Sequence, residues 1–367
     1  MNGHYIGLMT GSSVDAIDAA LVHFDSGAPQ LIKAVSKPFS PDTRNRIIQV
    51  THGEPCSVSE ICSLDAKIGA ELADAAQDLI DESDIEAKTV VAIGSHGQTV
   101  CHLPDETPSG TMQLGDAAQI AERTGITTVA DFRHRDMAAG GQGAPFAPVF
   151  HAAVLRSDTE DRCVVNLGGI ANVTVLPKQA SAPVVGFDTG PASALLDLWS
   201  QKNIGKRFDR DGEWSSGGTV IESLLQLWLD DTFFHRQPPK STGRDYFDEH
   251  WLNAKLAPAH NAQDVQATLA ELSAHTVADA VKQHAPQSKR VLICGGGVNN
   301  RDLLARIQRH LDDRIVESTS VHGVDPHWVE AMMIAWLTAR TLSGLPGNLP
   351  SVTGAAGERI CGAIYPA

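Results

Sequence analysis

The sequence predicts a mixed α/β fold built from a duplicated unit. Residues 5–24 and 163–177 share one plan, in which an apolar run, a glycine-rich turn and an alternating run follow one another. Elsewhere, apolar strand-like runs alternate with amphipathic helical patterns, which is typical of a mixed sheet with crossover helices. Because 367 residues exceed what one hydrophobic core usually organises, we expect two domains.

The first half of the chain follows this plan. "YIGLMTGSSVDAIDAALVHF" predicts a β-hairpin whose turn exposes backbone N–H groups. Apolar residues at helical spacing predict a helix over 59–83, and "TVVAIGSHG" and "ITTVADF" predict strands on either side of a helical pattern near "QLGDAAQIAERTG". The segment 131–148 is rich in Gly and Pro, and we expect it to cross between the domains and to cover a cleft.

The second half repeats strand and helix and then becomes more helical from Val220 to His284. Residues 290–311 predict a strand, a "GGGVNN" turn and a helix that has Leu303, Ile307 and Leu311 on one face and Asn299 or Asn300 as its cap. A last helix over 326–342 ends before Gly344 and Pro346, and "RICGAIY" predicts a strand that returns to the first domain.

Composition excludes several classes of partner. The formal charge is −15, with 44 acidic and 29 basic residues and no Lys/Arg run, so we expect neither nucleic acid nor an anionic membrane as a partner. The six cysteines form no CxxC pair and three lie in apolar runs, which favours buried, reduced thiols over disulfides. "MNGHYIGLM" lacks the charged and apolar regions of a secretory leader, and no window has 18 uninterrupted apolar residues, so we expect a cytoplasmic protein.

Three glycine-rich turns indicate a nucleotide site. The first, "GLMTGSSVDAID", combines small residues and hydroxyls with Asp15 and Asp18, which suits terminal phosphates and Mg²⁺. The second contains Asn166, Gly168 and Gly169, and the third spans 295–297. Each turn alone also fits an ordinary loop, but three backbone-exposing turns suit a nucleotide held between two similar domains, with two turns for the phosphates and one for the adenosine side.

Asp188 has two interpretations. It follows the apolar run "VVGF" and precedes "TGP", where Pro191 would suit a first helical turn. A carboxylate at this position fits a helix cap. It fits a general base equally well, because strand ends in α/β sheets line clefts.

Most of the other polar clusters fit ordinary structural roles better than catalytic ones. The His-containing stretches at 95–102 and 321–330 match no familiar zinc spacing and fit polar groups lining a cleft better. "DRDGEW" predicts a solvated turn, and "QPPKSTGRDYF" predicts a surface lid rather than a catalytic group. Arg133, Arg135 and Asp136 lie in the Gly-rich segment and suit a substrate clamp.

With these residues in view, the chain resembles the anhydro-N-acetylmuramic acid kinases, which belong to the actin, sugar-kinase and Hsp70 superfamily. The resemblance covers the whole length and rests on nine motifs in order: "GLMTGSSVDAID", "GSHGQTVCH", "QLGD", "DFRHRDMAAGGQGAP", "NLGGIAN", "GFDTGP", "PPKSTGRDYF", "GGGVNN" and "DPHWVEAMMIAWL". The family typically reads MSGTSLDGID at the first hairpin, and here Ala16 replaces its glycine. Since Ala tolerates a positive φ poorly, we expect an ordinary extended conformation there.

The resemblance implies two duplicated RNase H-like, actin-like ATPase domains with mixed sheets flanked by helices and a cleft between them. We place domain 1 at 1–133 plus 345–367 and domain 2 at 134–344. It further implies a cytoplasmic homodimer of peptidoglycan recycling, which takes a small amino sugar as substrate. No peptide-binding region follows the last helix, which disfavours the alternative of an actin- or Hsp70-like ATPase working by assembly or peptide binding.

In the implied reaction, water opens the 1,6-anhydro ring of 1,6-anhydro-N-acetylmuramic acid and O6 takes the γ-phosphoryl group of ATP, giving N-acetylmuramic acid 6-phosphate and ADP. An ordinary sugar kinase acting on a free hydroxyl is the sister alternative. By motif, Asp188 is the base, Glu330 is a second carboxylate that positions the water, and Thr99 and Arg133 hold the sugar. Mg²⁺ would bridge the ATP phosphates, with Asp15 or Asp18 holding it through water. The residues implied for ATP are Gly11, Ser12, Ser13, Val14, Asp15, Ala16, Ile17, Asp18, Asn166, Gly168, Gly169, Gly295, Gly296 and Gly297.

Overall fold

A computed structural model describes residues 1–11, 13–311 and 313–367, and the chain divides into two compact units. Unit 1 comprises Met1–Phe150 and Trp328–Ala367, and unit 2 comprises His151–His327. This division differs from the predicted boundaries because the segment 134–150 and the last long helix belong to unit 1. That helix packs on the first sheet, a contact that its sequence pattern could not reveal.

Unit 1 contains these elements in chain order: β1 (Gly3–Thr10), β2 (Ile17–Asp25), β3 (Ala28–Lys37), α1 (Pro41–Thr51), α2 (Val58–Asp81), β4 (Val90–Ser95), β5 (Gln98–Leu103), β6 (Gly110–Leu114), α3 (Ala117–Thr124), β7 (Thr128–Ala130), α4 (His134–Met137), α12 (Val329–Leu342), α13 (Pro350–Thr353) and β13 (Ala363–Tyr365). Helix α5 (Ala147–Val154) spans the division between the units.

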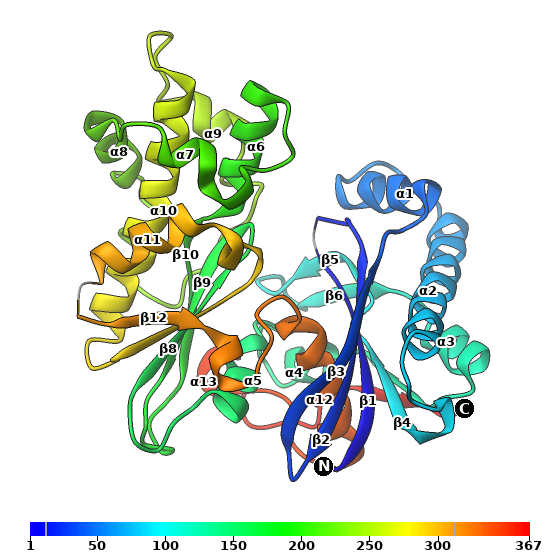
Figure 1. Ribbon diagram of the computed structural model, residues 1–367. Helices are drawn as coiled ribbons and strands as arrows, with labels where there is room; N and C mark the ends of the chain where they lie inside the picture. The colour runs from blue at the N-terminus through cyan, green and yellow to red at the C-terminus, as the bar shows by residue number, and fades with distance from the viewer. Residues whose placement is uncertain (12, 312) are drawn as a thin grey trace. The chain divides into compact units, whose positions relative to one another are not determined.

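Unit 2 contains these elements: β8 (Arg162–Leu167), β9 (Ile170–Leu176), β10 (Val185–Pro191), α6 (Ser193–Ile204), α7 (Glu213–Ser216), α8 (Glu222–Leu229), α9 (Glu249–Asn253), α10 (Ala262–His284), β11 (Arg290–Cys294), α11 (Arg301–His310) and β12 (Ile315–Ser318). Figure 1 labels both sets of elements.

The two main sheets share one topology. In unit 1 the strand order is β13-β7-β4-β1-β2-β3, and in unit 2 it is β10-β9-β8-β11-β12. Each sheet begins with three consecutive antiparallel strands, and two further strands then add in parallel beside the first of the three. The predicted hairpins, the duplication and the mixed α/β class are therefore confirmed.

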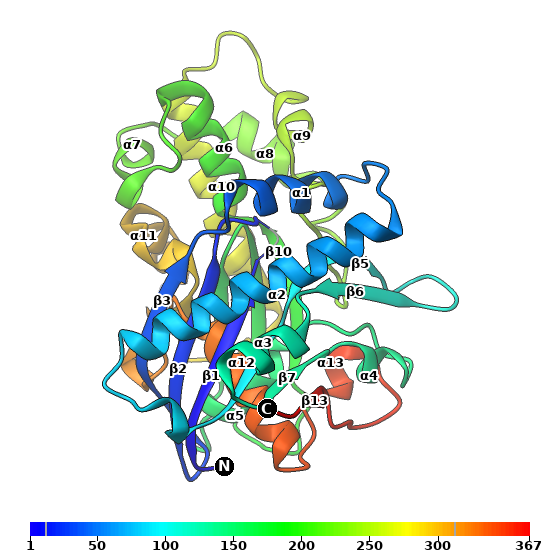
Figure 2. The same cartoon turned by 90° about the vertical axis from the view of Figure 1, so that its right-hand side faces the viewer.

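The sheet of unit 1 is covered by helices on both faces. Ile6 and Leu8 of β1 belong to a core cluster with Ile68 and Leu72 of α2, the helix predicted at 59–83. Figure 2 shows α2 running across the strands of this sheet. Helix α2 starts at Ser57, whose side chain accepts from the Glu60 N–H, while the Glu60 side chain accepts from the Ser57 N–H. This capping box fixes the start of the helix.

Helix α12 covers the opposite face through a pair of glycines. Gly7 of β1 and Gly94 of β4 are register partners on adjacent strands. A Cβ at Gly7 would overlap the carbonyl of Ala331, and one at Gly94 would overlap Oγ1 of Thr338. The helix backbone therefore approaches the sheet closely enough that only glycine fits at both positions.

Unit 2 has its own core. Leu303, Ile307 and Leu311 are buried on one face of the α11 segment, and the Asn300 side chain caps the helix by accepting from the Leu303 N–H, as predicted. A second cluster joins α6, α8, α9 and α10 around buried Trp228. The sequence prediction of a helical region from Val220 to His284 is confirmed in outline, as α8, α9 and α10 are separated by loops.

The C-terminal predictions also hold. Helix α12 ends at Leu342, and Gly344 adopts a φ of 65° before Pro346. Strand β13 lies within "RICGAIY" and pairs antiparallel with β7 of unit 1. The tail therefore returns to the first sheet, where it forms the edge strand.

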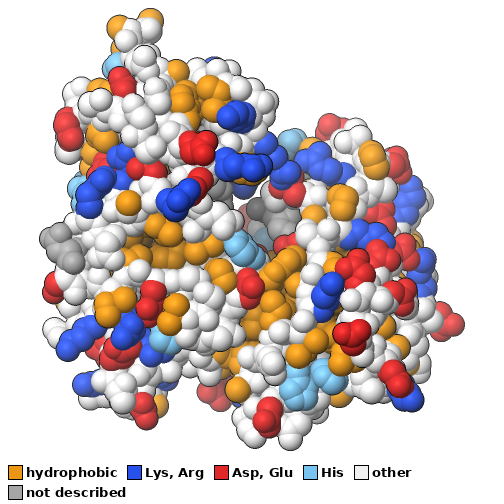
Figure 3. All heavy atoms as spheres, in the orientation of Figure 1, with side chains coloured by type: hydrophobic (Ala, Val, Ile, Leu, Met, Phe, Trp, Pro, Cys, Tyr) orange, Lys and Arg blue, Asp and Glu red, His pale blue; other side chains and the backbone are white. Residues whose placement is uncertain are grey.

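Charged side chains of opposite sign are interspersed over the face that carries α1 and α2 (Figure 3). The ion pairs there are Lys37–Asp78, Arg46–Glu60, Lys67–Asp42 and Arg123–Asp74. Within the described part of the chain, no helix is both long and apolar enough to cross a membrane.

The six cysteines are all free thiols. Cys163, Cys294 and Cys361 are buried, and Cys56, Cys62 and Cys101 are exposed. The prediction of burial is correct for the runs in β8 and β11. It is wrong for Cys101, because strand β5 forms a separate two-stranded sheet with β6.

Candidate active site

The first glycine-rich turn joins β1 to β2. Thr10 donates its hydroxyl to the Gly97 carbonyl at 2.8 Å, and the Gln98 amide donates to the Gly11 carbonyl at 3.4 Å, so the β4–β5 connection and the start of β5 support the turn. Ser12 lies outside the described residues. The remaining members assigned to the ATP site by resemblance form the turn and the start of β2: Gly11, Ser13, Val14, Asp15, Ala16, Ile17 and Asp18.

Val14, and not Ala16, has the unusual backbone of this turn. Val14 has a φ of 52°, although it is β-branched and buried, whereas the φ of Ala16 is not positive, as predicted. A β-branched residue in this region is strained, at a cost on the order of 1–3 kcal/mol. Packing and the bond from Arg44 Nε to the Val14 carbonyl, at 3.0 Å, hold it in place.

The two aspartates of this turn differ in their surroundings. Asp15 is exposed and lies 3.8 Å from the Arg44 guanidinium. Asp18 is half-buried on β2, where its Oδ1 accepts from the Ser36 hydroxyl at 2.7 Å. Desolvation raises the pKa of Asp18, and the Ser36 hydroxyl opposes this rise.

Glu330 lies in the first turn of α12. Glu330 is exposed, but many protein atoms surround its carboxylate. Desolvation is therefore the largest cause of its raised pKa. The charge of Asp18 raises this pKa further, and the charge of Arg133 lowers it. Unit 1 therefore brings together two carboxylates and one guanidinium that the sequence had assigned to different roles.

Arg133 is held by His96 and by the Gly-rich segment. Its Nη2 and Nε donate to Nε2 of His96 at 2.8 and 3.2 Å, and its Nη1 donates to the Gly143 carbonyl at 2.7 Å. A guanidinium has five N–H groups, so these contacts leave two for a ligand. Desolvation lowers the pKa of Arg133 to about 10, where it stays charged at neutral pH.

His96 is a buried, neutral acceptor. Its Nδ1 lies 2.7 Å from the Gly97 carbonyl, which requires the proton at Nδ1 and leaves Nε2 free to accept from Arg133. Desolvation, followed by the charge of Arg133, lowers the pKa of His96 to about 3. Thr99, three residues later on β5, is half-buried and accepts from the Gln113 amide at 3.3 Å.

The segment that carries Arg133 is anchored by a buried acid. Asp136 is fully buried and accepts from the Gly143 N–H, the Asn348 amide and the Thr353 hydroxyl at 2.8, 2.7 and 2.8 Å. Asp136 therefore ties the segment to the C-terminal tail and is a structural residue rather than a substrate clamp. Arg135 is exposed beside it.

In unit 2, the second turn joins β8 to β9. The Gly168 carbonyl accepts from the Ser193 N–H, and the Gly169 carbonyl accepts from the N–H groups of Ala192 and Ala194, at 2.9–3.1 Å. The start of α6 therefore occupies the carbonyl side of the turn. Asn166 lies near the end of β8, directly before it.

The third turn packs on the same strand end. Gly295 has a φ of 81°, and a Cβ there would overlap Oδ1 of Asn166. A Cβ at Gly297 would approach the Leu167 Cβ to 2.5 Å, whereas one at Gly296 would meet open space. Unit 2 thus brings together the two turns that the sequence assigned to phosphate and adenosine.

Asp188 is not a helix cap, and the strand does not end there. It lies within β10, which continues to Pro191 with an irregularity between Asp188 and Gly190, and α6 begins only at Ser193. Its Oδ2 accepts from the Ser241 hydroxyl at 3.0 Å and from the Thr242 N–H at 2.9 Å. Desolvation raises the pKa of Asp188, and these two donors and the charge of Lys240 oppose the rise.

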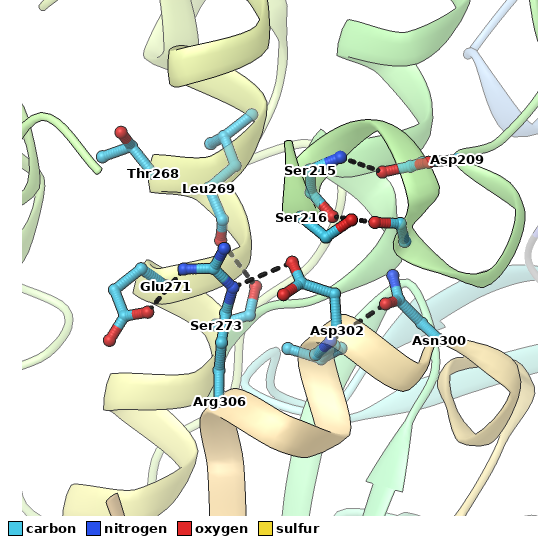
Figure 4. Close-up of polar contacts among 12 residues, drawn as sticks. Asp209, Ser215, Ser216, Thr268, Leu269, Glu271, Ser273, Asn300, Asp302 and Arg306 are labelled. Atoms are coloured by element: carbon cyan, nitrogen blue, oxygen red, sulfur yellow. Dashed lines mark hydrogen bonds and ion pairs between the residues drawn. The ribbon is translucent and has the colours of Figure 1, made fainter. Parts of the chain in front are cut away.

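A buried charge network stabilises the helix that follows the third turn (Figure 4). Arg306 of α11 donates to Asp302 at 2.9 Å and to Glu271 of α10 at 2.7 Å, and all three side chains are largely buried. Asp209, predicted in a solvated turn, is instead buried and accepts from the N–H groups of Trp214 and Ser215. The network fixes the start of α11 against α10.

Sequence reasoning missed the residues that hold these groups. His96, Ser241 and Thr242 occur inside motifs that were recognised, but only the fold shows that they contact Arg133 and Asp188. The segment predicted as a surface lid supplies both donors to Asp188. Among the described residues, no group of three His, Cys, Asp or Glu side chains is placed to hold a metal ion.

Comparisons with known proteins identify the family of this chain. Residues 3–367 match the profile of the family described as "Anhydro-N-acetylmuramic acid kinase". A relative of that description from Xanthomonas campestris pv. campestris is 51% identical over 99% of this chain and 97% of its own length. Another from Legionella pneumophila is 45% identical over 99% and 98%.

A weaker structural likeness is to component A of (R)-2-hydroxyglutaryl-CoA dehydratase from Acidaminococcus fermentans. It has a TM-score of 0.45 and 11% identity over 91% of this chain and 96% of that one, and a likeness of this size says nothing about activity. The family profile and the close relatives both span essentially the whole chain. The chain therefore belongs to the anhydro-N-acetylmuramic acid kinase family.

Proposed function

We propose that the protein uses ATP and water to convert 1,6-anhydro-N-acetylmuramic acid into N-acetylmuramic acid 6-phosphate and ADP. Water attacks C1, the C1–O6 bond breaks, and O6 forms a bond to the γ-phosphorus as the bond to ADP breaks. The water needs a base, whereas O6 needs no acid because phosphorus is its electrophile. The observation that carries this proposal is the fixed carboxylate of Asp188 in a chain of this family.

Asp188 is suited to take the proton from water. Two donors on one carboxylate oxygen, from Ser241 and Thr242, set its orientation. Its raised pKa makes it a stronger base than an exposed aspartate. The same two features favour proton abstraction over a purely structural role.

The residues of unit 1 are suited to the sugar. Arg133 has two N–H groups that its protein partners do not use, which suits a bidentate contact to the lactyl carboxylate. Thr99 offers a hydroxyl from β5. We assign Glu330 to the orientation of the attacking water, and its negative charge would also favour positive charge developing at C1.

ATP would be held by the three turns, and Asp18 or Asp15 would hold Mg²⁺ beside its phosphates. A phosphate-bound Mg²⁺ keeps several waters and needs only one or two carboxylates, so Asp18 fits the role, as a desolvated carboxylate whose pKa is raised. Asp15 is the exposed alternative. When bound, Mg²⁺ would supply charge neutralisation for the transferring phosphoryl group.

The direct test is the product formed from the anhydro sugar. NMR should show ring opening and O6 phosphorylation together, and ¹⁸O from solvent water should appear at C1. N-acetylmuramic acid, which has a free O6 hydroxyl, is the matched substrate control for an ordinary sugar kinase. Arrival of the label in phosphate, or preferential use of the free hydroxyl, would contradict the coupled scheme.

Asp188→Asn should lower the rates of ring opening and phosphorylation together by roughly 10²- to 10⁴-fold, because the positioned base is lost. Asp158→Asn, which changes an exposed aspartate of the same unit, serves as the control. A near wild-type rate for Asp188→Asn would show that another group is the base.

We also propose that the enzyme is a cytoplasmic homodimer, in line with the family resemblance and with its use of ATP. Light scattering during size-exclusion chromatography should then give twice the 39.1 kDa of the chain. A single-chain mass at working concentration would contradict the dimer. Fractionation of cells should place the enzyme with the cytoplasmic proteins.

A further inference from the structure

We propose that Arg244 contacts the phosphates of the nucleotide at the second turn and stabilises the transferring phosphoryl group. This inference rests on the proposed function and adds a residue of the segment 237–247 to its machinery.

The Arg244 guanidinium lies against the backbone of the second turn. An added Cβ at Gly169 would come within 2.5 Å of Nε, 2.7 Å of Nη2 and 3.0 Å of Cζ of Arg244. The guanidinium therefore occupies the space where any other residue would place its side chain. Glycine at 169 is needed for this arrangement as well as for access to the turn.

The carbonyl groups of this turn are already occupied. The Gly168 and Gly169 carbonyls accept from the N–H groups at the start of α6, as described above. Arg244 thus approaches a turn whose acceptors are used by the protein. A cation at this position is suited to an anionic ligand.

Arg244 keeps its charge available. Its side chain is exposed, and among the described residues it has no ion pair or hydrogen bond to an acid. In the same unit, Arg301 pairs with Asp211 and Arg306 pairs with Glu271 and Asp302. An arginine that binds phosphate needs a guanidinium that no acid of the protein occupies, because its planar fork then matches two phosphate oxygens.

The loop of Arg244 also holds the proposed base. The Lys240 carbonyl accepts from the Asp188 N–H at 3.1 Å, and Ser241 and Thr242 donate to the Asp188 carboxylate. Five consecutive residues, 240–244, therefore connect Asp188 to the Gly168–Gly169 turn. This arrangement couples the position of the base to the position of the phosphoryl group, as a reaction with simultaneous water attack and phosphoryl transfer requires.

The experiment compares Arg244→Gln with Arg244→Lys and with the control Arg236→Gln, which removes a positive charge from an exposed residue eight positions earlier. Calorimetric titration measures the affinity for ATP and for AMP, and steady-state assays measure kcat. Arg244→Gln should lower kcat roughly 10²- to 10³-fold and weaken ATP binding more than AMP binding. Arg244→Lys should recover part of this loss, and Arg236→Gln should match the wild type.

Gly169→Ala provides a second route that keeps the arginine. Its Cβ meets the far end of a flexible side chain, so the guanidinium should be displaced while the thermal midpoint changes little. The effect on kcat should largely disappear when Gly169→Ala is added to Arg244→Gln, because both changes remove one interaction. If the effects of the two substitutions on kcat were fully additive, the assignment of Arg244 would be contradicted. If Arg244→Gln does not fold, the kcat of Gly169→Ala alone tests the assignment.

The outcomes separate the two proposals. Unchanged kcat and unchanged ATP affinity in Arg244→Gln would overturn the assignment of Arg244. A wild-type chain that binds ATP without phosphorylating the anhydro sugar would contradict the proposed function, while the ATP titrations would still decide on Arg244. A wild-type chain that binds no ATP would overturn both.

Discussion

The guanidinium of Arg133 donates two hydrogen bonds to one nitrogen of His96, at 2.8 Å from Nη2 and 3.2 Å from Nε. These two bonds fix the orientation of the guanidinium, and with it the direction of the two N–H groups that remain for a ligand. His96 can accept only while it is neutral, and its low pKa keeps it so. We therefore expect His96 to position Arg133 for its proposed contact with the sugar.

His96→Asn should raise the KM for the anhydro sugar roughly 10- to 100-fold, which corresponds to a lost hydrogen bond to a charged group. The KM for ATP should change little, because the change acts through Arg133. Steady-state kinetics with each substrate varied in turn measures the difference. An equal rise of both KM values would indicate a general structural role instead.

Stability should fall with acid through His96. Its pKa is about 3 in the folded chain and 6.5 in an unfolded reference, so the unfolded state binds the extra proton between these values. The stabilisation is fully present above pH 6.5 and is lost toward pH 3, with a slope of at most about 1.4 kcal/mol per pH unit. Denaturant unfolding of the wild type and His96→Asn across this range should show a shallower slope in the variant, and equal slopes would contradict the prediction.

Ser241→Ala should move the acid limb of the kcat/KM profile to higher pH. The Ser241 hydroxyl stabilises the ionised form of Asp188, so its removal raises the pKa of the base further. The base must be ionised to act, so activity on the acid side is lost at a higher pH than in the wild type. Ser216→Ala, which removes a hydroxyl bonded to the Glu213 carbonyl, is the control. A shift in the opposite direction would mean that Asp188 does not govern this limb.

Arg306→Met should destabilise unit 2 by about 3–5 kcal/mol, because Asp302 and Glu271 would stay buried without the guanidinium that both carboxylates accept from. Arg309→Met removes an exposed arginine 3.7 Å from the same Glu271 and should cost no more than about 1 kcal/mol. Unfolding by urea measures both variants. Equal losses of unfolding free energy in the two variants would show that the burial of Arg306 adds no stability beyond that of an exposed arginine.

Much of the fold could be predicted because the local patterns are consistent with it. Both hairpins, the helix at 59–83, the cap at Asn300 and the returning strand β13 depend on turn chemistry and periodicity that a sequence displays. The domain assignment of α12 could not be predicted this way. Its partner strands lie more than 200 residues earlier, and its apolar pattern fits either sheet.

The site was predicted less completely than the fold. Asp188 is recognised by its motif, but its position inside β10 depends on a sheet irregularity, and its donors come from a loop 53 and 54 residues away. Arg244 looked like part of a surface lid because exposure and composition carry no information about the neighbouring Gly169. Residues that act through long-range contacts are the ones that a single sequence conceals.

The glycine pair beneath α12 has a consequence for how this enzyme can evolve. Glu330 lies in the first turn of a helix whose backbone packs on Gly7 and Gly94, and Gly7 lies on β1, the strand that leads into the first glycine-rich turn. The distance between this carboxylate and that turn therefore depends on the close packing of the α12 backbone against two glycines. No substitution at Gly7 or Gly94 can change this distance slightly, because even the methyl group of alanine does not fit there.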